Sequence, residues 1–258
     1  NLLLPMAGWG RVDLGAELRG ELFVDDLGAS GEEPVGDHQR LLGDVFVSAQ
    51  FQLWPERLRV VAGLRLASAS DYGAQLLPKL GLLVSLWKSD AGYVEIVANA
   101  GRSVRYPAFS ELYARFEGIR GDPSLEPEDA LAADGGLRLG LSWLRLEGAY
   151  FRRLLVNAIR FAAIDSQTMM AAQNFGFVHV QGVETALTLL PWRCVNLRGA
   201  YTYTGTRQGE GDHRLPGQPA QRVAARIAWD GPSCGRRGRG VPSWLRSARL
   251  YVALDWQG

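Results

Sequence analysis

The stretch RVDLGAELRGELFVD, from Arg11 to Asp25, alternates apolar and charged residues over its whole length. Val12, Leu14 and Leu18 fall on one side of an extended chain, and the charged residues fall on the other. A period of two over so many residues predicts a β-strand longer than the usual five or six residues. Such a strand also exceeds the roughly 9–11 residues that cross a bilayer at a tilt.

The same pattern returns along the rest of the chain, and turn residues separate the segments. We expect about twelve strands, because Gly, Pro and polar clusters recur at regular intervals between alternating runs. Residues 1–5 form an apolar lead-in of no clear type. The expected strands are 11–25, 40–52, 58–69, 78–86, 93–101, 129–139, 142–153, 154–162, 175–190, 195–206, 218–229 and 246–256.

The expected connections alternate in length along the chain. Short turns on one rim and long loops on the other are typical of an up-and-down outer-membrane barrel, and tryptophans near the short turns suit an interfacial girdle. Long loops are expected at 26–38, 70–77, 103–128, 163–173 and 207–217, and short turns at 53–57, 88–92, 139–142 and 191–193, with 230–245 as the exception. The tryptophans are Trp54, Trp87, Trp143, Trp192, Trp229 and Trp256.

These features predict an all-β fold: an antiparallel up-and-down transmembrane β-barrel, of which this chain supplies about twelve strands. Two packed sheets with their polar faces in water account for the same alternation, so a soluble sandwich is an alternative. The long strands and the charges that alternate over whole strands favour the barrel, which must close because hydrocarbon leaves no backbone group unpaired.

Composition excludes several classes of protein. With 28 basic and 27 acidic side chains the net charge is +1, which gives no long-range field for nucleic acid. The mean hydropathy of −0.06 is too polar for a helical membrane protein. Because the chain starts without Met or a signal peptide, we interpret it as an internal piece of a longer protein.

Nothing in the sequence predicts catalysis, a metal or a cofactor. The three histidines, His38, His179 and His213, are scattered, and no spacing puts two of them on one helix face. A Gly-x-Ser-x-Gly elbow is absent from the sequence. We therefore expect a protein that is not an enzyme.

The longest break between strands is RSVRYPAFSELYARFEGIRGDPSLEPE, at residues 102–128. Pro107 has no N–H for a ladder, so strand pairing is expected to stop near Tyr106. Phe109, Leu112 and Tyr113 then fall at helical spacing, which predicts one short helical turn inside a long loop.

This stretch resembles the barrel of TonB-dependent outer-membrane receptors, which reads roughly G-F-R-A-P-S-F-x-E-L-Y followed by G-N-P-x-L-K-P-E. A second match, NFGFVHVQGVETAL at 174–187, is similar to that family's N-x-G-x-x-x-x-x-G-x-E strand. Val104 and Asp122 depart from the family pattern. The matching residues are Arg105, Pro107, Phe109, Glu111, Leu112 and Tyr113, then Gly121, Pro123, Leu125, Pro127 and Glu128, and finally Gly182 and Glu184.

The resemblance implies that residues 1–258 are part of a barrel of about 22 strands with a plugged lumen. The plug domain, the TonB contact segment and further C-terminal strands are expected outside this chain. Implied partners are outer-membrane lipid, the protein's own plug, TonB and an imported small molecule such as a siderophore or cobalamin. The implied location is the bacterial outer membrane. A passive porin or structural outer-membrane barrel is the alternative, and a secreted β-sandwich that binds a ligand is a third.

The central loop combines cations and aromatic rings on the expected outer rim. Arginine forks bind carboxylate, catecholate or phosphate groups, and tyrosine stacks on flat ligands. The same residues also suit bracing of the loop, since two of them belong to the family motif. The candidate ligand-binding residues are Arg102, Arg105, Tyr106, Tyr113, Arg115 and Arg120.

The charged face of the strands is expected to line the lumen. Its alternating signs suit either a passage for a charged solute or a mutually paired, hydrated wall against a plug. Its members are Arg11, Glu17, Arg19, Glu21, Arg59, Arg65, Arg145, Glu147, Arg198, Arg222 and Arg226.

Two cysteines, Cys194 and Cys234, flank neighbouring ends of the expected hairpin 195–206 and 218–229. Those ends lie on the oxidising side of the membrane, so we predict that the two cysteines are bonded or close enough to be.

Overall fold

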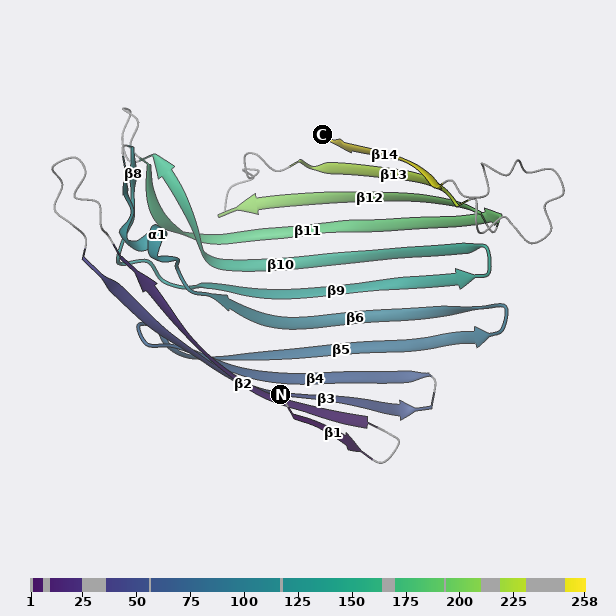
Figure 1. Cartoon of the computed structure of the whole chain (residues 1–258), viewed down its shortest axis with the longest axis horizontal. Helices are drawn as coiled ribbons and strands as arrows, with labels where there is room; N and C mark the ends of the chain where they lie inside the picture. The colour runs from purple at the N-terminus through teal and green to yellow at the C-terminus, as the bar shows by residue number, and fades with distance from the viewer. Residues whose placement is uncertain are drawn as a thin grey trace.

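The computed structural model describes residues 2–6, 10–24, 36–55, 57–116, 118–163, 170–192, 194–209, 219–230 and 249–258. Twelve strands follow one another in a single open antiparallel sheet, and the small hairpin β7–β8 joins it at β11 (Figure 1). The strands are β1 (Leu2–Met6), β2 (Gly10–Phe23), β3 (His38–Trp54), β4 (Leu58–Ala69), β5 (Gly73–Ser89), β6 (Gly92–Arg105), β7 (Arg115–Phe116), β8 (Ile119–Arg120), β9 (Glu128–Leu141), β10 (Leu144–Ala163), β11 (Met170–Trp192), β12 (Val195–Gln208), β13 (Gln221–Asp230) and β14 (Arg249–Gln257), with the helix α1 (Phe109–Tyr113) between β6 and β7.

The prediction of about twelve antiparallel strands with one short helical turn in the long loop is confirmed. The alternative of two packed sheets is wrong for the described residues, because their strands form one layer. None of the described helices is long and apolar enough to cross a membrane.

The two faces of the sheet differ in chemistry. We call the face on which α1 lies the inner face and the opposite face the outer face. Large apolar side chains on the outer face stay exposed: Leu18 is 72 % exposed, Leu22 70 % and Val45 59 %. Because continuous apolar surface of this extent marks contact with another apolar phase, the outer face suits lipid.

The connection between β4 and β5 corrects one expectation. The predicted loop at 70–77 is a turn of three residues, and β5 begins at Gly73 rather than at Pro78. Gly73 has a φ of 72°, which lets a tight turn close. Pro78 fits inside β5 because its only ladder partner there is Leu64 of β4, while pairing with β6 starts at Lys79.

Strand β10 corrects another expectation. Segments 142–153 and 154–162, predicted as two strands, form one strand from Leu144 to Ala163 that pairs with β11 over nearly its whole length. Residues 149–163 contain no Gly or Pro, so the sequence has no turn former around Arg153 and Leu154. The strand count still agrees because β1, taken from the sequence as a lead-in, is a strand.

Most of the predicted tryptophans lie at the rim with the short turns. Trp54, Trp87 and Trp143 are 61 %, 42 % and 54 % exposed there. Trp192 ends β11, and Trp229 lies at the same rim because it pairs with Val195. Trp256 is the exception: it pairs with Val223 near the start of β13, toward the other rim. The prediction for Trp256 was wrong because β14 begins beside Asp230, at the end of β13, and therefore ends toward the opposite rim.

Candidate functional site

The central loop folds back onto the inner face at the rim with the long connections, where Figure 1 shows α1 beside the ends of the strands. Leu112 and Leu125, which are 2 % and 3 % exposed, pack with Ile159 of β10 and Ala172 of β11. This cluster is small, but it ties both halves of the loop to the sheet. Phe109 of α1 packs against it from the side.

The N-terminus of α1 is held by a residue of its own first turn. The Glu111 carboxylate accepts the backbone N–H of Ala108 at 2.8 Å. Ala108 cannot return a side-chain cap, so this is half of a capping box. Glu111 therefore stays oriented toward the strand end that precedes the helix.

Arg105, the last residue of β6, joins three elements. Its Nε donates to Glu128 Oε2 at 2.6 Å, and its Nη1 donates to Glu111 Oε2 at 2.8 Å. Glu128 also accepts the backbone N–H of Ile159 at 2.7 Å. Charge-assisted bonds of this length are strong and directional, so they brace the loop between β6, β9 and β10.

An asparagine clamp holds the next part of the loop. Asn174 Oδ1 accepts the backbone N–H of Glu126 at 2.7 Å, and its Nδ2 donates to the Glu126 carbonyl at 3.0 Å and the Asn157 carbonyl at 2.8 Å. Asn157 has a φ of 57° and donates to the Glu126 carboxylate at 2.6 Å. One side-chain amide thus replaces a ladder pair where the loop meets β10 and β11.

Arg40 of β3 is the most deeply placed cation of the site, with a side chain that is 2 % exposed. Its Nε donates to Asp71 at 2.8 Å, and its Nη1 donates to the carbonyl of Pro107 at 2.8 Å. The guanidinium also lies 4.8 Å from the ring centroid of Phe109 and 5.4 Å from that of Tyr72. A buried charge is tolerated here because it is paired and bonded on several sides.

Aromatic stacking completes the brace. The rings of His38 and Tyr113 stack at 3.6 Å with 2° between their planes, and Tyr72 stacks on Tyr106 at 5.8 Å. Tyr72 donates its hydroxyl to the Leu125 carbonyl at 3.0 Å. Burial raises the pKa of both Tyr72 and Tyr106 above the usual tyrosine range, and the nearby acids add to the effect.

Below the loop, the inner face has a hollow of about 780 Å³. Its cations are compensated within the chain: Arg65 bonds Asp44 at 2.8 Å, and Arg19 lies 3.1 Å from Glu21. The hollow is therefore polar without a large excess of either sign, which suits a hydrated surface.

The six candidate ligand-binding residues divide into two groups. The guanidinium groups of Arg102 and Arg105 donate hydrogen bonds within the chain. Arg102 donates to Asp129, the Leu76 carbonyl and Gln75. Tyr106 donates to the Ala67 carbonyl at 3.3 Å, and Tyr113 is stacked on His38.

The other two candidates lie on the small hairpin β7–β8. Arg115 and Arg120 are cross-strand neighbours and both are exposed. Within the described part of the chain, the side chain of neither makes a hydrogen bond or an ion pair. The loop thus presents a pair of arginines at the rim, above a set of aromatic and arginine residues that brace it.

The family-like residues are mostly structural. A Cβ on Gly121 would lie 2.6 Å from the carbonyl carbon of Leu112, so the close approach of the two loop halves needs glycine there. A Cβ on Gly182 would collide with the Tyr203 carbonyl and lie 2.6 Å from the ring of Phe151. Glu184 lines a second inner hollow of about 340 Å³ together with Asp134 and Glu147.

Sequence reasoning missed Arg40, Asn157 and the full role of Asn174. Arg40 belongs to a strand that resembles all the others, and its partner Asp71 lies in the β4–β5 turn, which was predicted to be a longer loop. Asn157 could have been recognised as an irregular position in its strand, because asparagine is disfavoured inside strands and tolerates positive φ.

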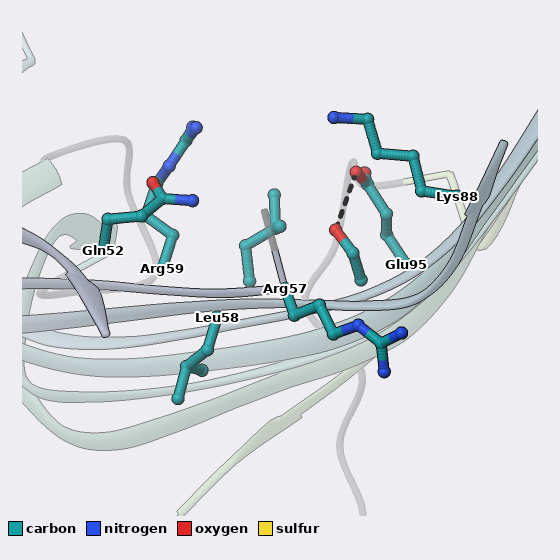
Figure 2. A pocket seen from close by; sticks show the side chains of 8 residues that line it. Gln52, Arg57, Leu58, Arg59, Lys88 and Glu95 are labelled. Atoms are coloured by element: carbon teal, nitrogen blue, oxygen red, sulfur yellow. Dashed lines mark hydrogen bonds between the residues drawn. The ribbon is translucent and has the colours of Figure 1, made fainter. Parts of the chain in front are cut away.

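The predicted lumen set lies on the inner face, where the ladder places its members. Several are paired: Arg11 lies 3.6 Å from Asp13, and Arg222 lies 2.6 Å from Asp255. A small pocket of about 230 Å³ lies at the rim with the short turns, where Ser85 Oγ donates to Glu95 Oε1 at 3.5 Å. Figure 2 shows Gln52 and Arg59 at one side of this pocket and Glu95 and Lys88 at the other. The labelled side chains Arg57, Arg59 and Lys88 make that rim basic.

The cysteine prediction stays a prediction. Cys194 lies in the turn between β11 and β12, and Cys234 lies outside the described residues. Val195 and Trp229 are partners, so the strand ends that the two cysteines flank do lie side by side.

Comparison with known proteins agrees with this geometry. Residues 8–257 match the family described as TonB dependent receptor-like, beta-barrel. The vitamin B12 transporter BtuB of Vibrio vulnificus (strain YJ016) is 24 % identical over 123 residues, which is 48 % of this chain and 19 % of that protein.

Solved structures show the same fold. A mutant of the ferric enterobactin receptor PfeA of Pseudomonas aeruginosa has a TM-score of 0.75 at 19 % identity, covering 99 % of this chain and 40 % of that one. The siderophore receptor PirA of P. aeruginosa has a TM-score of 0.71 at 18 % identity, covering 88 % and 41 %. The copper transporter OprC has a TM-score of 0.69 at 16 % identity, covering 87 % and 39 %.

This chain spans less than half the length of each of these proteins. The match to the family covers nearly all of this chain, and the open sheet, the apolar outer face and the braced loop fit it. The chain therefore belongs to the TonB-dependent receptor family, as part of its β-barrel.

Proposed function

We propose that this chain forms part of the wall of an outer-membrane receptor that takes up a scarce ligand with energy delivered by TonB. The observation that carries the proposal is the braced central loop: one rim is built to hold a fixed, Arg-bearing segment over the inner face. A wall that served only as a passive barrier or pore would have little use for so many bonds in one loop.

Siderophores and cobalamin are the ligand classes we propose, since the similar proteins include siderophore receptors and a vitamin B12 transporter. First contact is assigned to Arg115 and Arg120, because their exposed guanidinium groups make no hydrogen bond or ion pair within the described residues. Guanidinium groups bind carboxylate, catecholate and phosphate oxygens in pairs, and these are groups that such ligands carry.

The test uses the full-length gene in a strain that lacks its own receptors for ferric siderophores and cobalamin. We expect it to restore growth on one of these as the sole iron or cobalamin source, and we expect removal of TonB to abolish that growth. Restored growth that does not depend on TonB would instead favour the passive porin.

The double variant Arg115→Ala, Arg120→Ala tests the assigned contact. We expect uptake at low ligand concentration to fall by about tenfold, because two charge-assisted bonds are lost. Arg59→Ala removes an exposed arginine from the opposite rim and should leave uptake unchanged. Equal uptake by the double variant and the control would remove the two arginines from the ligand path.

A further inference from the structure

Three arginines form one transverse row on the inner face, near the rim with the short turns. Arg145 of β10 is the ladder partner of Thr188 of β11. Thr188 is also the partner of Arg198 of β12, and Arg198 is the partner of Arg226 of β13. Figure 1 shows these four strands side by side. Ladder partners point to the same face of a sheet, so we call Arg145, Arg198 and Arg226 the arginine row.

The arginine row is a local excess of positive charge. Its three side chains are exposed, and among the described residues none of them donates a hydrogen bond or pairs with an acid. The acids nearest to the row face other arginines: Glu147 is the ladder partner of Arg138, and Asp255 is bonded to Arg222 at 2.6 Å.

Arg198 and Arg226 are like charges on adjacent strands. Strand spacing places them about 4.8 Å apart along the ladder, which destabilises the sheet unless an anion lies between them. The Arg226 guanidinium lies 5.1 Å from the ring centroid of Tyr251. That contact uses the face of the guanidinium and leaves its N–H donors available.

The surroundings of the row suit a bulky ligand with several anionic groups. Three guanidinium groups and the Thr188 hydroxyl supply donors, and the row itself contains no carboxylate. Such donors bind carboxylate, catecholate and phosphate oxygens. The adjacent ladder row toward the middle of the wall consists of small side chains on β11, β12 and β13, which leave space above the sheet: Ala186, Ala200 and Ala224.

The row lies at the opposite end of the wall from the central loop. Arg145 is the second residue of β10, and Arg226 comes four residues before the end of β13 at Asp230. In outer-membrane barrels the short turns face the periplasm, so this is the exit end of the lumen. Arg115 and Arg120, to which first contact is assigned, lie at the entrance.

We propose that Arg145, Arg198 and Arg226 form an anion-binding site at the exit end of the lumen, and that the imported ligand is a multiply charged anion which binds there as it leaves. This deepens the proposed uptake function and rests on it for the cargo. The row selects an anionic metal chelate over cobalamin, which has no net charge in its cyano form. An acidic protein segment has matching charge, but its same-face side chains lie about 6.6 Å apart when extended, which fits the closer pair Arg198 and Arg226 less well.

The first experiment modifies arginines of the full-length receptor in detergent with phenylglyoxal, and peptide mass spectrometry follows each residue. Citrate is the probe because it carries three carboxylates, and sodium chloride of equal ionic strength is its control. The matched control residue is Arg59, an exposed inner-face arginine near the same rim whose ladder partners are Gln52 and Leu83.

We expect citrate to slow modification of Arg198 and Arg226 by about fivefold or more, and that of Arg59 by less than about twofold. Equal slowing at Arg59, or none at the row, would overturn the anion site. Modification of the row that stays slow without citrate until the receptor is denatured would show that a protein segment covers it, which also overturns the proposal.

The second experiment measures import by the triple variant Arg145→Gln, Arg198→Gln, Arg226→Gln in the receptor-deficient strain. The probes are ferric enterobactin, a trianionic chelate, and cyanocobalamin. We expect the variant to bind ferric enterobactin at the cell surface at 0 °C like the wild type, which shows that it folds, but to import it about tenfold more slowly at 37 °C. Arg59→Gln should leave the import rate unchanged.

An unchanged import rate in the triple variant would show that the cargo does not bind the row. Import of cyanocobalamin in preference to ferric enterobactin would overturn the anionic cargo. Growth that does not depend on TonB would refute the proposed function alone, because protection of the row by citrate does not require import.

Discussion

Arg105 closes β6 and Glu128 opens β9, and the two residues are direct cross-strand partners whose side chains bond at 2.6 Å. The loop that joins the two strands therefore begins and ends on one ion pair. Glu111 of α1 binds the same guanidinium at 2.8 Å, so the helix is fixed to the point where the loop leaves the sheet.

We expect Arg105→Ala to release the loop without unfolding the sheet. The side chain is 45 % exposed, so solvent screening reduces the loss to about 1 kcal/mol. Chymotryptic cleavage within residues 106–127 should then become about fivefold faster. Arg59→Ala is the control, and an unchanged cleavage rate in Arg105→Ala would show that the ion pair does not hold the loop.

Arg40→Ala should cost more stability than Arg105→Ala because Arg40 is buried. It would leave Asp71 and the Pro107 carbonyl without their donors, at a cost of about 3 kcal/mol in unfolding free energy. Denaturant unfolding in detergent measures the change. Arg40→Lys keeps the charge but lacks the planar fork, so its unfolding free energy should lie between those of the wild type and Arg40→Ala. A loss below about 0.5 kcal/mol in Arg40→Ala would contradict this account.

Gly182→Ala should destabilise the wall, whereas Gly199→Ala should not. A Cβ at Gly182 meets the Tyr203 backbone and the Phe151 ring, while a Cβ at Gly199 meets nothing within 4 Å. We expect a loss of about 2 kcal/mol for Gly182→Ala from overpacking, and little change for Gly199→Ala. Equal melting temperatures for the two variants would refute the packing argument.

Tyrosine ionisation should report on the loop at alkaline pH. Because burial raises the pKa of Tyr72 and Tyr106, the neutral hydroxyls favour the folded loop below about pH 10. That contribution is lost as the pH rises through the raised pKa values. In a titration followed at 295 nm, Tyr72→Phe and Tyr106→Phe should each remove signal from the late part of the curve. Loss from the early part would contradict the burial of that residue.

The cysteine prediction can be checked by mass. We expect the full-length protein to resist alkylation at Cys194 and Cys234 until it is reduced, and then to gain two alkyl groups. Val195 and Trp229, at the strand ends that the two cysteines flank in the sequence, are ladder partners. Alkylation of either cysteine without reductant would show that they are not joined.

The sequence alone determined the strands and the side each residue faces, because a period of two is a local property that burial and hydrocarbon both enforce. It also located the loop, since Pro107 ends β6 where predicted. Local signals misplaced two strand boundaries. Pro78 does not begin β5, because it lies where β5 is not yet paired with β6. The chain does not turn at 153–154, because β11 continues to pair with β10 across these residues.

Only the tertiary structure decided which charged side chains are paired with other residues of the chain. Arg102, Arg105, Arg115 and Arg120 read alike in the chain, yet the first two are held by acids from β9 and α1, and the last two are not paired within the described residues. Partners 23 to 27 residues away meet because the sheet register brings strand ends together, and that register is a property of the whole wall. The same register places Arg145, Arg198 and Arg226 in one row on the inner face, which no single stretch of sequence reveals.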